Sequence, residues 1–249
     1  MKKKNEGGKS EPKKQPLSRS KLELFIDCPR CFYADLKLGV KRPPSFPMSL
    51  NNAVDTLFKK EFDRHRKFKT VHPLLKDAGV DAIPFQHPEL EDWRRRNRGV
   101  RYLHEESGFE VYGLVDDVWQ DRRTKELIVA DYKATSKSTE VNLDAEWQNS
   151  YKRQVEVYQW LLRQRGFKVS DKAYFVYTNG RQDLPEFANK LIFVTKLILH
   201  SCDSRWVEPA LHKAAHLLRQ TKIPASSKNC KHCIYVKQAA SLKSLSFAQ

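Results

Sequence analysis

The chain has 249 residues, 40% of them hydrophobic, which is enough to bury one substantial core. Its 46 lysines and arginines outnumber 30 aspartates and glutamates, and the formal charge of +16 favours a polyanionic partner such as nucleic acid. No window approaches the roughly twenty apolar residues of a membrane span, and no Gly-rich phosphate loop occurs, so we expect neither a membrane protein nor a nucleotide hydrolase.

The first sixteen residues differ in composition from the rest of the chain. They are rich in lysine and lack apolar content, so we predict a disordered basic tail at residues 1–16 and a single domain at residues 17–249. No apolar run follows the opening Met-Lys-Lys-Lys-Asn, and no signal peptide is therefore expected. We expect a cytoplasmic protein whose thiols stay reduced.

Helix-like and strand-like segments alternate along the domain. Helical patterns mark four segments: Ser18–Leu38, Ser49–Lys67, Leu143–Arg165 and Ser204–Gln220. Strand-like composition marks five: Val100–His104, Phe109–Trp119, Glu126–Ala134, Lys172–Thr178 and Leu191–Leu199. Ser18 is the expected N-cap of the first helix. The predicted fold class is α/β, a mixed sheet of about five strands flanked by helices.

Charged residues end an apolar strand in the middle of the chain. Two-residue periodicity places Asp131 and Lys133 on the same face of that strand. A turn at Asp121–Lys125 would join it to the preceding strand in an antiparallel hairpin, so Asp116 and Asp131 are expected side by side. Paired carboxylates suit Mg²⁺ or Mn²⁺. Lys133 would orient the attacking water or neutralise a phosphate, or it would be a strand-edge lysine that prevents aggregation.

Three further features have two interpretations each. Gln154 and Tyr158 share a helix face, where they would hold a phosphate or brace a metal site, or be ordinary amphipathic surface. Asp117 competes with Asp116 as the ligand, because a bulge would exchange the two. The run Trp93–Arg98 would dock bases and phosphates beside an aromatic ring, or be a solvated helix end.

Three motifs in fixed order resemble a known nuclease group: Gly113-x-x-Asp116, Asp131-x-Lys133 and Gln154-x-x-x-Tyr158. This pattern is similar to the RecB-like branch of the PD-(D/E)XK nuclease superfamily, which includes CRISPR-associated exonucleases and the AddB nuclease domain. The resemblance covers residues 17 to 233 and implies a restriction-endonuclease-like core. The implied roles are metal binding by Asp116, Asp131 and the carbonyl of Tyr132, catalysis by Lys133, and support from Gln154 and Tyr158.

The family usually has one more metal ligand, a histidine on an early helix. The best match for that histidine here is Asp55, which keeps an oxygen donor for Mg²⁺ but adds negative charge. A metal site of three aspartates is one prediction. An exposed helix residue with no metal is the other.

Two Cys-x-x-Cys pairs lie near the two ends of the domain, Cys28 with Cys31 and Cys230 with Cys233. Their spacing predicts a four-thiolate metal site that joins both ends, but it does not separate Zn²⁺ from a 4Fe-4S cluster. The resemblance favours the 4Fe-4S cluster, although related enzymes place one cysteine before the nuclease core and three after it. The two-and-two arrangement keeps structural zinc as the alternative. Cys202 is expected to lie outside the metal site.

Together these observations favour a Mg- or Mn-dependent deoxyribonuclease that acts as an exonuclease on single-stranded DNA or duplex ends. A helicase, or proteins of CRISPR adaptation or DNA repair, would be its partners. The alternative is a weakly active or inactive protein that keeps the nuclease fold and binds nucleic acid or docks a partner. A purely structural metal module would leave the acidic residues unexplained.

Overall fold

The computed structural model describes residues 14–44 and 49–242, so residues 1–13 of the predicted tail lie outside it. Gln15 and Pro16, which we assigned to the tail from sequence, begin strand β1 (Gln15–Ser18). Helix α1 (Arg19–Asp27) follows, and the hydroxyl of Ser18 caps it as predicted by accepting a hydrogen bond from the Lys21 backbone N–H at 3.3 Å. Regular secondary structure among the described residues therefore begins at Gln15.

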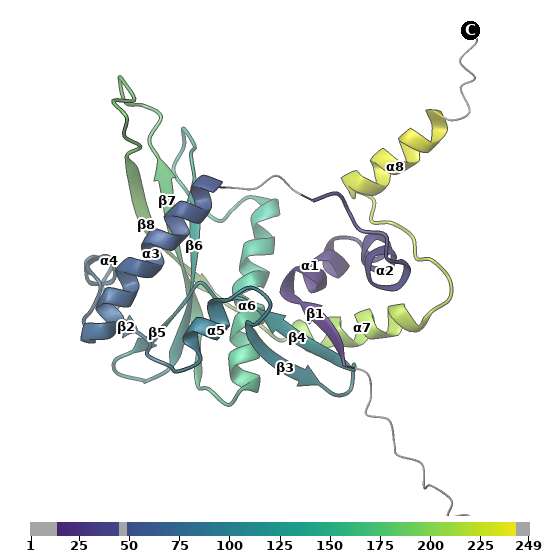
Figure 1. The fold of residues 1–249 in the computed structure, drawn as a ribbon, viewed down its shortest axis with the longest axis horizontal. Helices are drawn as coiled ribbons and strands as arrows, with labels where there is room; N and C mark the ends of the chain where they lie inside the picture. Colours follow the sequence, from purple (N-terminus) through teal and green to yellow (C-terminus); the bar gives the residue numbers. More distant parts are fainter. Residues whose placement is uncertain (1–13, 45–48, 243–249) are drawn as a thin grey trace, which may run out of the picture.

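A five-stranded mixed sheet forms the centre of the molecule and confirms the predicted α/β class. The spatial order is β2-β5-β6-β7-β8. The bounds are β2 (Ala82–Pro84), β5 (Asp117–Asp121), β6 (Leu127–Thr135), β7 (Val169–Gly180) and β8 (Phe193–Ser201). β6 and β7 are parallel, and the other neighbouring pairs are antiparallel. β7 and β8 continue into a long hairpin at one end of the sheet (Figure 1).

A smaller sheet corrects one of the sequence predictions. The segment Phe109–Trp119 is not one strand, because it divides into β4 (Phe109–Gly113) and β5, which lie in different sheets. β4 pairs with β3 (Val100–His104) and with β1. Apolar residues alternate through the break, so periodicity alone could not locate it. The hairpin of β5 with β6 does form, and its register pairs Asp117 with Ala130.

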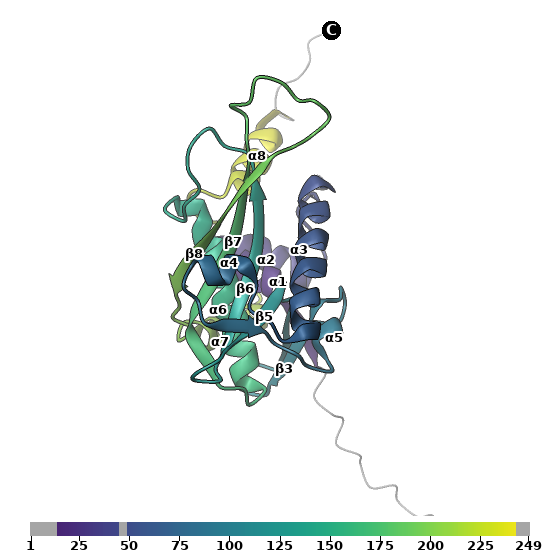
Figure 2. The same cartoon turned by 90° about the vertical axis from the view of Figure 1, so that its left-hand side faces the viewer.

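Helices cover both faces of the five-stranded sheet. α3 (Ser49–Phe68) lies along one face (Figure 2), where Phe62 stacks on Trp119 with ring centroids 5.4 Å apart. The other face carries α6 (Asn149–Gln164), which shares a core of buried apolar side chains with β6, β7 and α7 (Val207–Arg219). Three short helical elements are α4 (Pro73–Asp77), α5 (Leu90–Arg94) and η1 (Glu146–Gln148).

The first predicted helix is two helices, which is a second correction. α1 ends at Asp27, and α2 (Pro29–Leu38) begins after Cys28, which has the extended dihedrals φ −158° and ψ 105°. Pro29 explains the break, because a proline disfavours helical dihedrals in the residue before it. α8 (Lys231–Leu242) lies near α2 in Figure 1, so the C-terminal helix approaches the N-terminal ones. None of the described helices is long and apolar enough to cross a membrane.

Candidate active site

Asp116 and Asp131 face each other where β5 meets β6. The register that pairs Asp117 with Ala130 sets Asp116 across from Asp131. One oxygen of Asp116, Oδ2, accepts a hydrogen bond from the backbone N–H of Tyr132 at 3.0 Å. The β5–β6 hairpin thus brings together the two carboxylates that the sequence predicted to be neighbours.

Burial strongly disfavours the charge on Asp131. Its side chain is fully buried, and this burial, reinforced by the nearby Asp116 charge, raises the pKa of Asp131 to about 7 despite the opposing effect of Lys133. One oxygen, Oδ1, accepts a hydrogen bond from Nε2 of Gln154 at 2.8 Å. The other, Oδ2, forms an ion pair with the ammonium of Lys133.

Lys133 places its ammonium against the carboxylate of Asp131, and the charge of Asp116 also acts on it. Burial alone would lower its pKa, but the charges of Asp131 and Asp116 outweigh burial and raise the pKa of Lys133. Nζ also lies 3.5 Å from Oε1 of Gln154 and 4.4 Å from the ring centroid of Tyr151. Lys133 is therefore a charged, nearly buried lysine inside the site, and the alternative of a solvent-facing strand-edge lysine does not describe its position.

Gln154 holds these groups in place from α6. Its Nε2 donates to Asp131 and also, at 3.0 Å, to the hydroxyl oxygen of Tyr158. Burial raises the pKa of Tyr158 to about 12, so its phenol stays neutral. Gln154 and Tyr158 are both buried, so the alternative of an exposed amphipathic surface does not apply. The structure thus connects the second and third motifs through direct hydrogen bonds.

Gly113 is required by the ring of Tyr158. A Cβ atom added to Gly113 would lie 2.6 Å from Cε1 and 2.8 Å from Cδ1 of that ring, which no real side chain would tolerate. The glycine of the first motif therefore leaves room for the tyrosine of the third. This contact explains why Gly113 and Tyr158 occur together in one chain.

Asp55 lies at the edge of the same site on α3. Its Oδ2 accepts a hydrogen bond from Lys59 at 2.7 Å, and Lys59 Nζ is 3.8 Å from Oδ1 of Asp116. Burial, together with the charge of Asp116 and against that of Lys59, raises the pKa of Asp55. Among the described residues, the carboxylate oxygens of Asp55, Asp116 and Asp131 do not all lie within 4.8 Å of one another, the spacing that marks a group able to hold a metal ion. The three-aspartate site stays a prediction.

Asp117 belongs to a different environment from Asp116. Its fully buried carboxylate accepts hydrogen bonds from Arg66, from Arg94 at 2.8 Å and from the phenol of Tyr132 at 2.8 Å. The Asp117 carboxylate is therefore engaged in buried ion pairs and hydrogen bonds, and Asp116 is the carboxylate that faces Asp131. They also place the Tyr132 side chain beside Asp117, and only its backbone N–H bonds to Asp116.

The arginine run divides into buried and exposed parts. Trp93 is 1% exposed, and Arg94 binds Asp63, Asp117 and the backbone carbonyl of Asp116. Neither side chain is free to dock a base. Arg95 and Arg98 remain exposed and lie 3.9 and 3.6 Å from the Asp92 carboxylate. The predicted aromatic and arginine platform is therefore not formed by this run as a whole.

Two cations of the site were missed from sequence. Lys59 of α3 contacts Asp55 and Asp116, although its sequence context gave it no role in the site. Arg19, the first residue of α1, lies close enough for its charge to oppose the rise in the pKa of Asp131 and of Tyr158. No local motif marks either residue, since their positions depend on how distant helices pack. The four-residue spacing of Asp55 and Lys59 was the one available signal.

The donor set at the strand ends fits a divalent cation. Asp131 Oδ2 is a buried carboxylate oxygen whose partner among the described residues is the Lys133 ammonium, and Asp116 Oδ1 lies 3.8 Å from the Lys59 ammonium. Carboxylate oxygens are the ligands that Mg²⁺ and Mn²⁺ prefer. A cation between the two carboxylates would relieve the charge repulsion that raises the pKa of Asp131.

Four cysteines form a compact group between the two ends of the domain. The sulfurs of Cys28, Cys31, Cys230 and Cys233 all lie within 4.8 Å of one another. Three pairs are 3.5 to 3.8 Å apart, which is too long for a disulfide bond. Nη2 of Arg42 donates to Cys230 Sγ at 3.3 Å, which favours a thiolate. The predicted convergence of the two cysteine pairs is confirmed.

Cys202 lies apart from this group, as predicted. Burial raises the pKa of Cys202 to about 12, and its sulfur lies 3.7 Å from the His200 carbonyl oxygen. His232, between the two late cysteines, is exposed. The cysteine cluster among the described residues therefore consists of the two Cys-x-x-Cys pairs.

Comparison with known proteins agrees with the geometry. The family model of the PD-(D/E)XK nuclease superfamily matches residues 46–238, most of the chain. The match includes both carboxylates, Lys133, Gln154 and the late cysteine pair, and it excludes α1, α2 and the early cysteine pair. A search of curated proteins finds no match to the chain.

Proposed function

Because the chain belongs to the PD-(D/E)XK nuclease superfamily, we propose that it is a metal-dependent DNA nuclease that cuts single-stranded DNA or DNA ends. The observation that carries this proposal is the group formed by Asp116, Asp131 and Lys133 at the end of β6. Gln154 holds two members of this group through hydrogen bonds. The net positive charge supports affinity for a polyanion without sequence preference.

Each polar side chain has a distinct part in the proposed hydrolysis. A bound Mg²⁺ or Mn²⁺ would supply Lewis acidity and a more acidic water, and Asp116 and Asp131 would hold it. The ammonium of Lys133 would lie beside the scissile phosphate, where it would stabilise the extra negative charge of the transition state. Gln154 fixes the carboxylate of Asp131, and Tyr158 fixes Gln154. Strand cleavage would leave a 5′-phosphate and a 3′-hydroxyl.

We also propose membership of the RecB-like branch. The order of the three motifs and the presence of cysteine pairs on both sides of the nuclease core support it. Exonuclease action, a cytoplasmic location, and partnership with a helicase or with CRISPR or repair proteins follow from that branch as proposals. Residues 17–249 would act as one domain, because α1 and α2 pack against α7 and share the core of α6.

For the cysteine site, the sulfur distances support the zinc alternative over the 4Fe-4S cluster. A tetrahedral ion with Zn–S bonds of about 2.3 Å spaces its sulfurs roughly 3.8 Å apart, and three observed distances are 3.5 to 3.8 Å. In a 4Fe-4S cluster each cysteine binds a different iron, so the sulfurs must lie farther apart. Colourless protein with stoichiometric zinc would support this assignment. Brown protein containing iron would contradict it.

One observation favours the alternative of a weakly active binding protein. The Lys59 ammonium contacts Asp55 and approaches Asp116, so it already neutralises part of the charge that would attract a metal ion. If this contact blocks metal binding, wild type would bind DNA without cutting it, and Lys59→Ala would gain metal-dependent cutting. Lys60→Ala, which removes an exposed lysine from the same helix, is the matched control.

The test of the nuclease proposal is cleavage of an end-labelled single strand with Mg²⁺ or Mn²⁺. We expect wild type to cut and Lys133→Ala to lose at least about a hundredfold in rate, the size of effect that one electrostatic group provides. Lys172→Ala is the control, because Lys172 is an exposed lysine on the neighbouring strand β7. Equal cutting by wild type and Lys133→Ala would exclude the assigned site.

A further inference from the structure

Trp147 is an exposed tryptophan in a protein that buries most of its others. All five tryptophans lie in the described part of the chain, and Trp147 is 54% exposed, whereas Trp93, Trp119 and Trp160 are at most 4% exposed. It belongs to the 3-10 helix η1, directly before α6. Exposing a large aromatic ring forgoes the free energy of burial. The ring is therefore available to a partner outside the folded chain.

The ring of Trp147 is connected to the candidate active site through one other ring. It packs edge-on against Tyr151, with centroids 5.3 Å apart and an interplanar angle of 83°. The ring of Tyr151 in turn lies 4.4 Å from the ammonium of Lys133. The exposed indole is thus separated from the lysine of the site by a single aromatic side chain.

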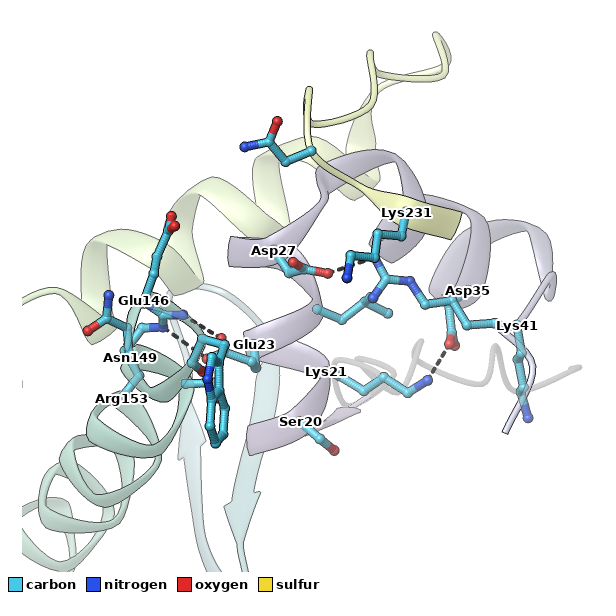
Figure 3. Close-up of a pocket in the computed structure, with 15 residues that line it drawn as sticks. Ser20, Lys21, Glu23, Asp27, Asp35, Lys41, Glu146, Asn149, Arg153 and Lys231 are labelled. Carbon is cyan, nitrogen blue, oxygen red and sulfur yellow. Dashed lines mark hydrogen bonds and ion pairs between the residues drawn. The ribbon is translucent and has the colours of Figure 1, made fainter. Parts of the chain in front are cut away.

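Positive charge accompanies this aromatic pair. The ammonium of Lys137 lies 5.5 Å from the centroid of the Trp147 ring. Trp147 also lines a groove of about 800 Å³ between α1, η1 and the start of α6. Lys41 and Lys231 line the same groove and form no ion pair with any described residue (Figure 3). Aromatic rings interleaved with unpaired cations are the features that bind single-stranded nucleic acid.

The acidic residues of the groove are mostly neutralised by the chain itself. Arg153 of α6 forms a two-pronged ion pair with Glu23 of α1, at 3.0 and 2.6 Å, across the groove in Figure 3. Lys21 is likewise paired with Asp35. Asp27 is paired with Arg42, so Glu146 is the one carboxylate of the lining that forms no ion pair with a described residue, against the two unpaired lysines.

We propose that Trp147 is a stacking platform for an unpaired base, which places the adjoining phosphate of a single strand at Lys133. The occupant is single-stranded DNA that lies in the groove, with its phosphates toward Lys41 and Lys231. Bases within a duplex already stack on their neighbours and cannot cover the indole, so the platform selects single strands or frayed ends. This inference rests on the proposed nuclease function, for which it names the substrate class and a positioning residue.

The experiment measures binding of labelled DNA in the presence of a chelator, so that no strand is cut. Trp147→Ala should bind a single strand between about 5-fold and 150-fold more weakly than wild type, the range found for loss of one stacking contact. Trp147→Phe should retain most of the affinity, and a blunt duplex should bind wild type and Trp147→Ala equally. Phe187→Ala is the matched control, because Phe187 is 62% exposed and does not line the groove.

Strands with a single abasic site test whether a base is the group that stacks on Trp147. When an abasic site is moved along the strand, one position should remove the difference between wild type and Trp147→Ala. Equal single-strand affinity of Trp147→Ala and Phe187→Ala would overturn the platform, and so would an equal loss on single strand and duplex. Failure of the nuclease proposal is a separate result, because wild type would then cut no strand with Mg²⁺ or Mn²⁺, whatever Trp147→Ala does to binding.

Discussion

At the scale of single residues, the adjacent aspartates of the first motif have opposite surroundings. Asp117 is fully buried and binds the guanidinium groups of Arg66 and Arg94, while Asp116 is partly exposed and faces Asp131. Neighbouring strand residues point to opposite sides of a sheet, so Asp117 stabilises the fold and Asp116 belongs to the candidate active site.

We predict that Asp116→Asn and Asp117→Asn separate cutting from stability. Asp117→Asn should lower the free energy of unfolding by about 3–5 kcal/mol, because it removes the buried carboxylate that Arg66 and Arg94 share and leaves them only the more exposed Asp63. Asp116→Asn should change stability little and abolish metal-dependent cutting. Urea unfolding followed by circular dichroism, together with the cleavage assay, checks both. A strongly destabilised Asp116→Asn that still cuts DNA would reverse the assignment.

Gly113 offers a prediction about the contact between the first and third motifs. Gly113→Ala should displace the ring of Tyr158, since the new Cβ would lie 2.6 Å from it. Overpacking of this kind lowers the free energy of unfolding by about 1–3 kcal/mol, and the displacement should also slow cutting by loosening Gln154. The control is Gly180→Ala, whose added Cβ would come no closer than 3.3 Å to Phe193. Equal unfolding free energies for the two variants would contradict this account.

At the scale of elements, α4 begins with a cap that depends on pH. Nδ1 of His72 accepts a hydrogen bond from the Leu74 backbone N–H at 3.1 Å, which requires an unprotonated nitrogen. Burial lowers the pKa of His72 below 6.5, and the nearby Glu61 opposes this only in part. The unfolded chain therefore takes up this proton more readily than the folded one. The stabilisation is complete above pH 6.5 and is lost as the pH falls toward the pKa of the folded state.

We predict that His72 makes the free energy of unfolding decrease as the pH falls from about 7.5 to 5.5, while the raised pKa of Asp131 acts in the opposite direction. His72→Asn keeps an acceptor at the cap and cannot be protonated, so its free energy of unfolding at pH 5.5, relative to pH 7.5, should be higher than that of wild type. His216→Asn, which replaces an exposed histidine on α7, should follow wild type. An identical pH dependence for His72→Asn and wild type would exclude the cap as a source of the effect.

Elements and motifs were predictable to different degrees. Strand β6 was found because it is a short apolar run ended by charged residues, and helix α6 because of its helical pattern; their motif residues do lie together. The division of Phe109–Trp119 between two sheets was missed, because alternation continues through it. The positions of Lys59 and Arg19 were missed because they arise from packing between helices and the sheet, which no local pattern encodes.

At the scale of the whole molecule, the cysteine site joins segments about two hundred residues apart. Cys28 lies between α1 and α2, and Cys233 lies in the first turn of α8, with their sulfurs 3.8 Å apart. None of the described residues of α8 is buried, so the helix has little packing of its own to hold it. A metal ion bound by the four cysteines would supply most of the interaction that holds α8 against α1 and α2.

We predict that Cys230→Ser releases the bound metal and lowers the melting temperature by at least about 5 °C, because metal binding contributes to folding free energy. Cys202→Ser should keep the metal and melt near wild type, since Cys202 is outside the site. Metal analysis and thermal unfolding measure both effects. Full metal content in Cys230→Ser would show that the four thiolates do not act together.

The most direct test of the central claim is the single-turnover cleavage rate of Asp131→Asn with saturating Mn²⁺. Asparagine retains the oxygen that Gln154 binds and removes only the negative charge, so folding can be verified independently by circular dichroism. We predict a folded protein that binds single-stranded DNA and cuts it at least about a thousandfold more slowly than wild type. A folded Asp131→Asn that cuts at the wild-type rate would contradict the proposed active site.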